Sequence, residues 1–191
     1  MLKSIYFNEW DLKPMGFKHL GKNIKISSDA RIYGQENISI GDNVRIDDFV
    51  ILSAGDGYID IGNYVYIARS SHISGIMGVK LCDFSSMAAN TVIYSASDDY
   101  SGDYLTAQAI PQEYTNAIGG LVYIGRHVII GSACTFVGPC VVAEGCSIGS
   151  MTLVIKDLLP WGIYVGIPAK RLKDRHKGLL KLEQELLGEK P

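Results

Sequence analysis

The chain has 191 residues, of which 47% are hydrophobic and 20% are charged, and this composition is typical of one soluble globular domain. The formal net charge of −2 provides no field that would steer a polyanion, so nucleic acid is not an expected partner. No run approaches 18 apolar residues and the first residues lack a signal-peptide core, so we expect no membrane insertion and a cytoplasmic location.

Residues 1–22 contain no regular repeat and are expected to form a short helical cap. Apolar side chains that can cover the open end of a repetitive core occur at Trp10, Leu12, Met15, Phe17 and Leu20. A repetitive coil needs such a cap because its first turn would otherwise expose an apolar cross-section to water.

A six-residue repeat begins at Ile26. Its leading Ile, Leu or Met side chains stand at positions 26, 32, 40, 46, 52, 61, 67, 73, 81, 87 and 93. The steps are six residues except after positions 32, 52 and 73, where they are eight or nine, so every third corner is longer and the turns contain 20, 21 and 20 residues. Doublets that should begin the same wall of successive turns are Ile38/Ile40, Ile59/Ile61, Val79/Leu81 and Val122/Ile124.

The repeat is clearest between Val122 and Lys156. Leading apolar residues fall at Ile124, Ile130, Phe136, Val142, Ile148 and Val154, and small or β-branched residues fall at Val128, Cys134, Cys140, Cys146 and Thr152. A helical period of 3.6 would drift from this spacing, and a strand period of two would put the intervening apolar residues on the wrong face. The pattern predicts an all-β solenoid over residues 23–156, a parallel β-helix of hexapeptide repeats.

Three evenly spaced cysteines, Cys134, Cys140 and Cys146, raise the question of a metal site. Six residues on a triangular coil turn the chain by one wall, so the three thiols should enter the core from different walls. We therefore expect reduced, buried cysteines that fill small spaces, and no metal.

After Ile93 the next long corner is replaced by residues 95–120, a loop of unusual length for a compact domain. It contains Tyr100, Tyr104 and Tyr114 among several acidic residues, which is not the composition of a bare linker. We expect an extruded arm that covers a site or contacts a neighbouring subunit.

Residues 157–191 are expected to form a closing segment and a C-terminal helix. Leu172, Leu179, Leu182 and Leu186 fall on one helical stripe, although Gly178 weakens it. The start of this helix is basic, at Lys170, Arg171, Lys173, Arg175 and Lys177. Those charges fit either a solvated helix face or an anion site.

The hexads, the extruded loop and the closing sequence Gly166-Ile167-Pro168-Ala169-Lys170 resemble the hexapeptide-repeat acyltransferases, of which the galactoside and maltose O-acetyltransferases are the best-known branch. The resemblance covers about residues 24–175. It implies a left-handed coil, against the usual right-handed crossover rule. It also implies acetyl-CoA as co-substrate and a homotrimer with active sites between subunits.

Two positions depart from the family's pattern. The catalytic histidine of the family falls on Asp98, and the asparagine it uses near the acceptor falls on Ala68. A sugar hydroxyl needs a base, and such assistance accelerates the reaction roughly 100- to 10,000-fold. An amine with a pKa near 8 is already about a tenth neutral at pH 7 and can attack a thioester without a strong base. The missing histidine therefore favours an amine acceptor or a different base.

The candidates for that base are Asp98, in the arm, and His72, at a corner near Ala68. A solvated loop acid and a structural corner histidine are the corresponding alternatives. Asp99 and Tyr100 are candidate sugar contacts, and we expect His127 to be structural.

The family positions that line the acyl donor correspond to Ser132, Ser150, Lys156, Lys170 and Lys173. Backbone groups near Ser132, Ala133, Ser150 and Met151 can pair with the pantetheine amides. Cations at Lys156, Lys170, Arg171 and Lys173 can face the nucleotide phosphates. Trp161 can stack on the adenine or close the lower end of the coil.

Three strings, 45–49, 93–102 and 160–171, give a narrower resemblance, to the dTDP-4-amino-4,6-dideoxyglucose N-acetyltransferases of O-antigen gene clusters. It implies a nucleotide-linked amino sugar as acceptor, for lipopolysaccharide biosynthesis. A sugar O-acetyltransferase is the alternative. A γ-type carbonic anhydrase needs three convergent histidines, whereas only His72 and His127 lie in the coil. A non-catalytic scaffold would need neither the basic donor positions nor the arm.

Overall fold

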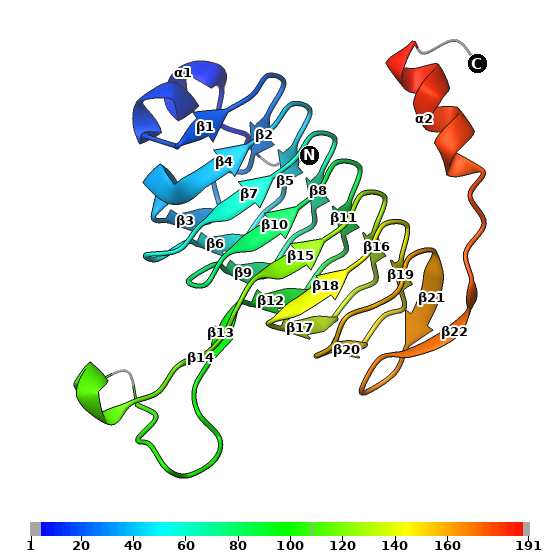
Figure 1. Ribbon diagram of the computed structural model, residues 1–191. Helices are drawn as coiled ribbons and strands as arrows, with labels where there is room; N and C mark the ends of the chain where they lie inside the picture. Colours follow the sequence, from blue (N-terminus) through cyan, green and yellow to red (C-terminus); the bar gives the residue numbers. More distant parts are fainter. Residues whose placement is uncertain (1–4, 108, 189–191) are drawn as a thin grey trace.

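The computed structural model describes residues 5–107 and 109–188, in which each hexad forms one short strand and successive strands turn onto three walls in rotation (Figure 1). This is the parallel β-helix that the repeat predicts, with the left-handed coiling that the family resemblance implies. Residues 1–4 of the expected cap, residue 108 of the arm and residues 189–191 of the C-terminal segment lie outside the described residues.

The first wall contains β1 (His19–Leu20), β4 (Ile38–Ile40), β7 (Ile59–Ile61), β10 (Val79–Leu81), β15 (Val122–Ile124) and β18 (Cys140–Val142). The second wall contains β2 (Lys25–Ile26), β5 (Arg45–Ile46), β8 (Tyr66–Ile67), β11 (Ser86–Met87), β16 (Ile129–Ile130), β19 (Ser147–Ile148), β21 (Gly162–Val165) and β22 (Lys170–Asp174). The third wall contains β3 (Arg31–Tyr33), β6 (Ile51–Ser53), β9 (His72–Ser74), β12 (Val92–Tyr94), β17 (Thr135–Val137) and β20 (Leu153–Val154).

The register of the strands confirms the predicted alignment of the repeats. In the first wall, Val79 pairs with Ile59 on one side and with Val122 on the other, so the predicted doublets stack on one another. The leading side chains point inward and fill the core; the largest that are fully buried are Phe136, Ile26, Ile38, Ile40, Ile46, Leu52, Ile59, Ile67, Ile73, Leu81, Met87 and Ile93. Each contributes on the order of 1.5–3 kcal/mol through burial.

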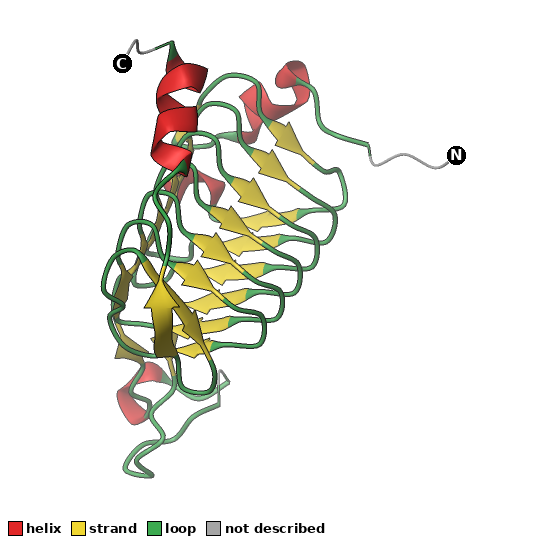
Figure 2. Cartoon of the chain, turned by 90° about the vertical axis from the view of Figure 1, so that its right-hand side faces the viewer, coloured by secondary structure: helices red, strands yellow, loops and turns green. Residues whose placement is uncertain are grey.

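Two of the three corners are tight turns that repeat in every rung (Figure 2). In most rungs each corner places one non-glycine residue in the left-handed region, with φ between 54° and 60°. At the first corner, between the first and second walls, these residues are Asn23, Asn43, Tyr64, Phe84 and His127. At the second corner, between the second and third walls, they are Phe49, Ser70, Asn90, Ala133 and Met151. Side chains at both corners therefore form columns along the outside of the coil.

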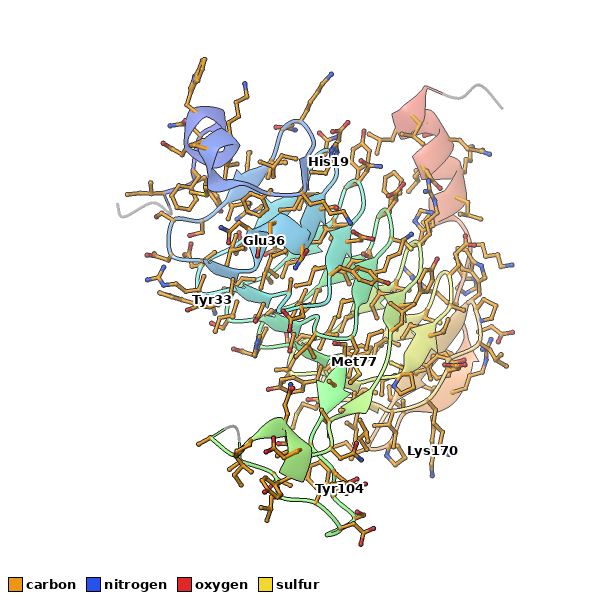
Figure 3. The ribbon with its side chains drawn as sticks, turned by 60° about the vertical axis from the view of Figure 1, so that its left-hand side comes forward. His19, Tyr33, Glu36, Met77, Tyr104 and Lys170 are labelled. Atoms are coloured by element: carbon orange, nitrogen blue, oxygen red, sulfur yellow. The ribbon has the colours of Figure 1, made fainter. Side chains whose placement is uncertain are left out.

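The third corner, between the third wall and the next strand of the first, is the long one, and it extrudes the arm of residues 95–120. A two-stranded stem, β13 (Ala96–Ser97) paired with β14 (Ile118–Gly119), leads the chain outward, and a short 3-10 helix, Gln112–Tyr114, lies within the arm. Figure 3 shows Tyr104 on this arm, projecting beyond the coil that carries Met77. The predicted arm is thus separate from the coil except at its base.

The N-terminal segment covers the first rung of the coil with α1 (Glu9–Leu12) and the 3-10 helix Lys13–Met15. Leu12 is buried, and Met15, Phe17 and Leu20 pack against the core, as predicted. Trp10 was expected to help cover the core but is 80% exposed, because it lies on the outer side of a single helical turn. The first wall already begins at β1, inside the segment expected to be a cap.

The C-terminal segment differs from the sequence prediction because the basic run expected at the start of the helix lies before it, with Lys170, Arg171 and Lys173 in β22. Leu172 lies in β22, which pairs antiparallel with β21, and is not on the helix, since α2 (Leu179–Leu187) begins only after Gly178. The pairing wins because β21 leaves an open edge at the end of the second wall. No helix among the described residues is long and apolar enough to cross a membrane.

The cysteines are buried where the repeat predicts: Cys140 lies in β18 of the first wall, Cys134 directly precedes β17 of the third wall, and Cys146 directly precedes β19 of the second wall. The Cys134 thiol donates to the carbonyl of Gly149 at 3.1 Å, and the Cys146 thiol donates to that of Leu159 at 3.2 Å. Burial raises the pKa of Cys140 to about 12. These thiols are therefore protonated core side chains, and residues 5–107 and 109–188 hold no cluster of three or more His, Cys, Asp or Glu suited to a metal ion.

Candidate functional site

The second corner carries the four donor candidates that rely on backbone groups. Its rungs are tied together by hydrogen bonds from Asn90 N–H to the Arg69 carbonyl (3.2 Å), from Ala133 N–H to the Ala89 carbonyl (3.0 Å) and from Met151 N–H to the Ser132 carbonyl (2.9 Å). Ser132, Ala133, Ser150 and Met151 are all exposed. This column therefore presents a continuous, ordered edge to solvent.

Ser132 and Ser150 have unused hydrogen-bonding groups on that edge. Neither their amide N–H groups nor their hydroxyls have a hydrogen-bond partner within the described part of the chain. Because the column is held by its neighbours' hydrogen bonds, these donors are fixed in space without being satisfied. Such groups can pair with the amides of an extended ligand that lies along the corner.

The acidic pair at the base of the arm divides into two roles. The Asp99 carboxylate accepts from Ser101 N–H at 2.7 Å, from the Ser101 hydroxyl, and from the Asn116 amide at 3.0 Å. The hydrogen bonds from Ser101 and then Asn116 lower the pKa of Asp99. Asp98, in contrast, is exposed and its carboxylate has no partner among the described residues. Asp99 therefore holds the arm in shape, whereas Asp98 is free to meet a substrate.

Tyr100, the other predicted sugar contact, is 89% exposed and lies next to this pair. Little of its ring is covered by the residues that the structure describes. It is available for contact with a ligand or with another molecule.

His72 begins β9 on the outer face of the third wall. Its imidazole is half-buried against the ring of Tyr94, with centroids 5.6 Å apart and planes at 80°. Burial lowers the pKa of His72 below its ordinary value, so the ring is neutral at pH 7. In the described structure neither ring nitrogen has a hydrogen-bond partner. The ring can therefore accept a proton or a hydrogen bond.

The third wall separates the two halves of the predicted site. The second corner, with Ser132 and Ser150, lies at one edge of this wall, and the arm with Asp98 leaves from the opposite edge. Strands of three residues span roughly 10 Å. One chain therefore does not bring Asp98 to the donor column, and in the described structure no hydrogen bond or ion pair joins Asp98 to His72.

The basic candidates are also divided. Lys156 follows β20 at the third corner, whereas Lys170 and Lys173 lie on β22 at the end of the coil opposite His19 (Figure 3). All three are exposed and form no ion pair with a described residue. Their charges are available to an anion near the C-terminal rungs.

Arg171 has a different environment. Its guanidinium donates to Asp174 (2.8 Å) and the Tyr164 hydroxyl (2.9 Å), and lies within hydrogen-bond reach of the carbonyls of residues 159–161. A Cβ at Gly162 would lie 2.6 Å from an Arg171 nitrogen, so a larger residue there would displace the guanidinium. The arginine clamps the end of the coil, and its donors point at the protein.

Sequence reasoning missed an aromatic column at the first corner. The rings of Tyr64 and Phe84 stack at 4.8 Å, and those of Phe84 and His127 stack at 5.3 Å. Trp161 continues the column at 6.4 Å from His127 and lies over Gly145. The one-rung spacing of aromatic residues at the same corner position was the available signal.

Helix α2 returns along the coil and docks on this column (Figure 1). Glu183, on α2, accepts from Arg126 and lies 2.8 Å from His127 Nε2. The Arg126 guanidinium also pairs with Asp83 at 3.1 Å and lies 4.9 Å from the Phe84 ring centre. Between α2 and the coil is a hollow of about 300 Å³. His127 is thus part of the helix attachment, as its expected structural role required.

No protein-family model matches the chain, but individual relatives do. A dTDP-4-amino-4,6-dideoxy-D-glucose acyltransferase from Escherichia coli is 46% identical over 178 residues, which are 93% of each chain. The crystal structure of an AntD variant, an N-acyltransferase from Bacillus cereus in complex with dTDP-4-amino-4,6-dideoxyglucose and coenzyme A, is 40% identical with a TM-score of 0.94 and covers 98% of this chain and 100% of that one.

A more distant structure shares the fold alone. A maltose O-acetyltransferase from Clostridium difficile is 20% identical, with a TM-score of 0.54 over 86% of this chain and 73% of that one. The similarity is therefore much stronger to acyltransferases of amino sugars than to the O-acetyltransferase branch.

Proposed function

The chain belongs to the family of acyltransferases that includes the dTDP-4-amino-4,6-dideoxy-D-glucose acyltransferase of E. coli, and from this membership we propose its substrates and its assembly. It transfers the acetyl group of acetyl-CoA to the amine of a dTDP-linked 4-amino-4,6-dideoxy sugar. The observation that carries this proposal is the 46% identity over 93% of both chains. The complex of AntD with the amino sugar and coenzyme A supports it.

The residues present fit a coenzyme A ligand. The unsatisfied N–H and hydroxyl groups of Ser132 and Ser150 can bind the pantetheine amides along the second corner. The exposed ammonium groups of Lys170 and Lys173 lie at the C-terminal end of the same coil, where phosphates would lie. Arg171 is left out of this set because its donors bind the protein. The thioester supplies an activated acetyl carbonyl.

Asp98 acts on the acceptor. Its free carboxylate can accept a hydrogen bond from the amine, orient the lone pair toward the carbonyl carbon and take the proton as the C–N bond forms. The proton then passes to the thiolate as the C–S bond breaks. His72 has a lowered pKa and an unpartnered ring, so it can serve the same step from the coil side.

A second copy of the chain completes the site. Asp98 and the donor column lie at opposite edges of the third wall, so the arm of one copy must reach the second corner of a neighbour. The exposed aromatic side chains of the arm, Tyr100, Tyr104 and Tyr114, suit such a contact. A homotrimer with three equivalent sites satisfies this requirement.

The four free cysteines fit a reducing compartment, and we place the enzyme in the cytoplasm. Its product is a nucleotide-linked acetamido sugar, and we assign it to the biosynthesis of O-antigen or a related lipopolysaccharide.

The test compares acceptors that differ only at the reacting atom. Release of free thiol from acetyl-CoA is measured with dTDP-4-amino-4,6-dideoxyglucose, with dTDP-6-deoxyglucose, which has a hydroxyl at C4, and with maltose and simple galactosides. We expect turnover with the amine alone. Turnover only with hydroxyl acceptors would show that the protein is a sugar O-acetyltransferase. No turnover with any acceptor would favour a non-catalytic scaffold.

A further inference from the structure

An exposed aromatic side chain, Phe49, lies on the N-terminal part of the second corner and contributes little to packing of the folded chain. Phe49 occupies the left-handed turn position with φ of 59°, a conformation that bulky side chains rarely adopt. Its side chain is 62% exposed. A core or packing role does not explain a phenylalanine at this position.

The two acids beside Phe49 are turned into the protein. The Asp47 carboxylate accepts from Tyr66 Oη at 2.7 Å, from Arg45 Nε at 2.7 Å and from Tyr6 Oη at 3.1 Å. The Ser27 hydroxyl donates to Asp48 at 2.6 Å. Both carboxylates are therefore engaged by groups of the same chain, and the exposed acid in this part of the corner is Asp29, in the turn one rung before Phe49.

A free cation lies one rung further along the same corner. The hydrogen bond from Ser70 N–H to the Asp48 carbonyl, at 3.0 Å, stacks the turn of Arg69 and Ser70 directly on that of Phe49. Arg69 is exposed, and its guanidinium has no hydrogen-bond or ion-pair partner among the described residues. The turns that carry Phe49 and Arg69 are thus adjacent rungs of the same corner, with backbones about 4.8 Å apart.

The order of rungs along the column supplies the direction. Residues 27–30 form the first rung of this corner, Phe49 and Arg69 occupy the second and third, Asn90 occupies the next, and the donor candidates Ala133 and Met151 follow. The acyl donor approaches from the C-terminal side, so an acceptor that meets it must extend toward the N-terminal side. The rung between Arg69 and Ala133 carries the small side chains of Ala88 and Ala89, which leave room for the part of the acceptor that meets the donor.

We propose that Phe49 and Arg69 bind the nucleoside diphosphate of the acceptor, with the base against the phenylalanine ring and the diphosphate at the guanidinium. This inference rests on the proposed function and adds to it the part of the site that selects the nucleotide. Stacking is sequence-tolerant, whereas a guanidinium pairs with phosphate oxygens through two parallel hydrogen bonds. The sugar amine then lies near Asn90, between the two substrates' binding segments.

The test measures dTDP affinity by calorimetry, together with KM for the dTDP-amino sugar and for acetyl-CoA. Phe49→Ala and Arg69→Met should each weaken dTDP binding about 10-fold or more and raise the acceptor KM in parallel. The KM for acetyl-CoA should stay unchanged. Phe49→Tyr should retain most of the affinity, because a second aromatic ring preserves the stacking face.

Two variants serve as matched controls. Trp10→Ala removes another exposed aromatic side chain, and Lys80→Met removes another exposed cation, on the first wall. Neither should change dTDP affinity. If wild-type protein acetylates the amino sugar while both corner variants bind dTDP normally, the subsite is wrong and the proposed function stands.

Other outcomes are equally decisive. Equal losses of dTDP and coenzyme A affinity would mean that Phe49 and Arg69 support the fold, and would overturn the inference. Wild-type protein that neither binds dTDP nor acetylates the amino sugar would overturn the proposed function and this subsite with it.

Discussion

Replacing Gly145 with alanine is expected to displace Trp161 and to destabilise the C-terminal half of the coil. A Cβ at this position would lie 2.4, 2.5 and 2.6 Å from three atoms of the indole, well inside van der Waals contact. Gly145 also has φ of 70°. The left-handed backbone costs an alanine about 1–2 kcal/mol, and moving the crowded ring costs about 1–3 kcal/mol more.

Gly16→Ala separates these two contributions. Gly16 has φ of 77°, but a Cβ there would have no atom within 4 Å, so only the backbone cost applies. We therefore expect Gly145→Ala to lose about 2–5 kcal/mol and Gly16→Ala about 1–2 kcal/mol. The difference between them measures the displacement of Trp161.

The assay is guanidinium unfolding at one protein concentration, followed by tryptophan fluorescence. The chain has two tryptophans, so a Trp10→Phe background leaves Trp161 as the single reporter. The native emission of Gly145→Ala should also shift, because the indole loses its place beneath His127. Equal losses for the two variants within about 0.5 kcal/mol, with unchanged emission, would refute the packing argument.

Two further predictions concern the catalytic candidates. Asp98→Asn should lower kcat about 100-fold or more without changing Tm, because the carboxylate is exposed and unpartnered in the described structure. Asp99→Asn should instead lower Tm, because it weakens the hydrogen bonds from Ser101. If both variants changed kcat and Tm equally, this division of roles would be contradicted. Because burial lowers the pKa of His72 in the folded protein, the imidazole binds a proton more tightly in the unfolded chain. The folded state therefore has its full stability with respect to His72 above about pH 6.5, and it loses stability as the pH falls through that value. Urea midpoints between pH 7.5 and 5.5 should therefore fall less for His72→Gln than for wild type, and parallel curves would exclude the effect.

Much of the fold could be predicted from the sequence because the coil repeats a local pattern. The spacing alone assigns residues such as Ile61, Leu81 and Ile124 to the first wall, and each is buried there. The extruded arm followed from the one interval that broke the repeat. Leu172 escaped the prediction because a helical stripe and an edge strand compete there, and the open edge of β21 decides between them.

The site was less predictable because its properties depend on partners distant in sequence or on another copy. Asp98 and Asp99 are adjacent and chemically identical, and only the position of Asn116 in the folded arm distinguishes them. Arg171 matched a basic motif, yet its donors bind the last turn of the coil. Glu183 lies 57 residues from Arg126, with no local pattern to connect them.

The return of α2 makes the two ends of the coil mechanically unequal. A solenoid frays from its terminal turns, where a rung has a neighbour on one side only. Here the C-terminal segment holds the last turns in place. Arg175 donates hydrogen bonds to the carbonyls of His127, Gly145 and Cys146, and Glu183 on α2 pairs with His127. The C-terminal end of the coil must break these hydrogen bonds before it can unfold. Cooperative unfolding is therefore expected to begin at the N-terminal end.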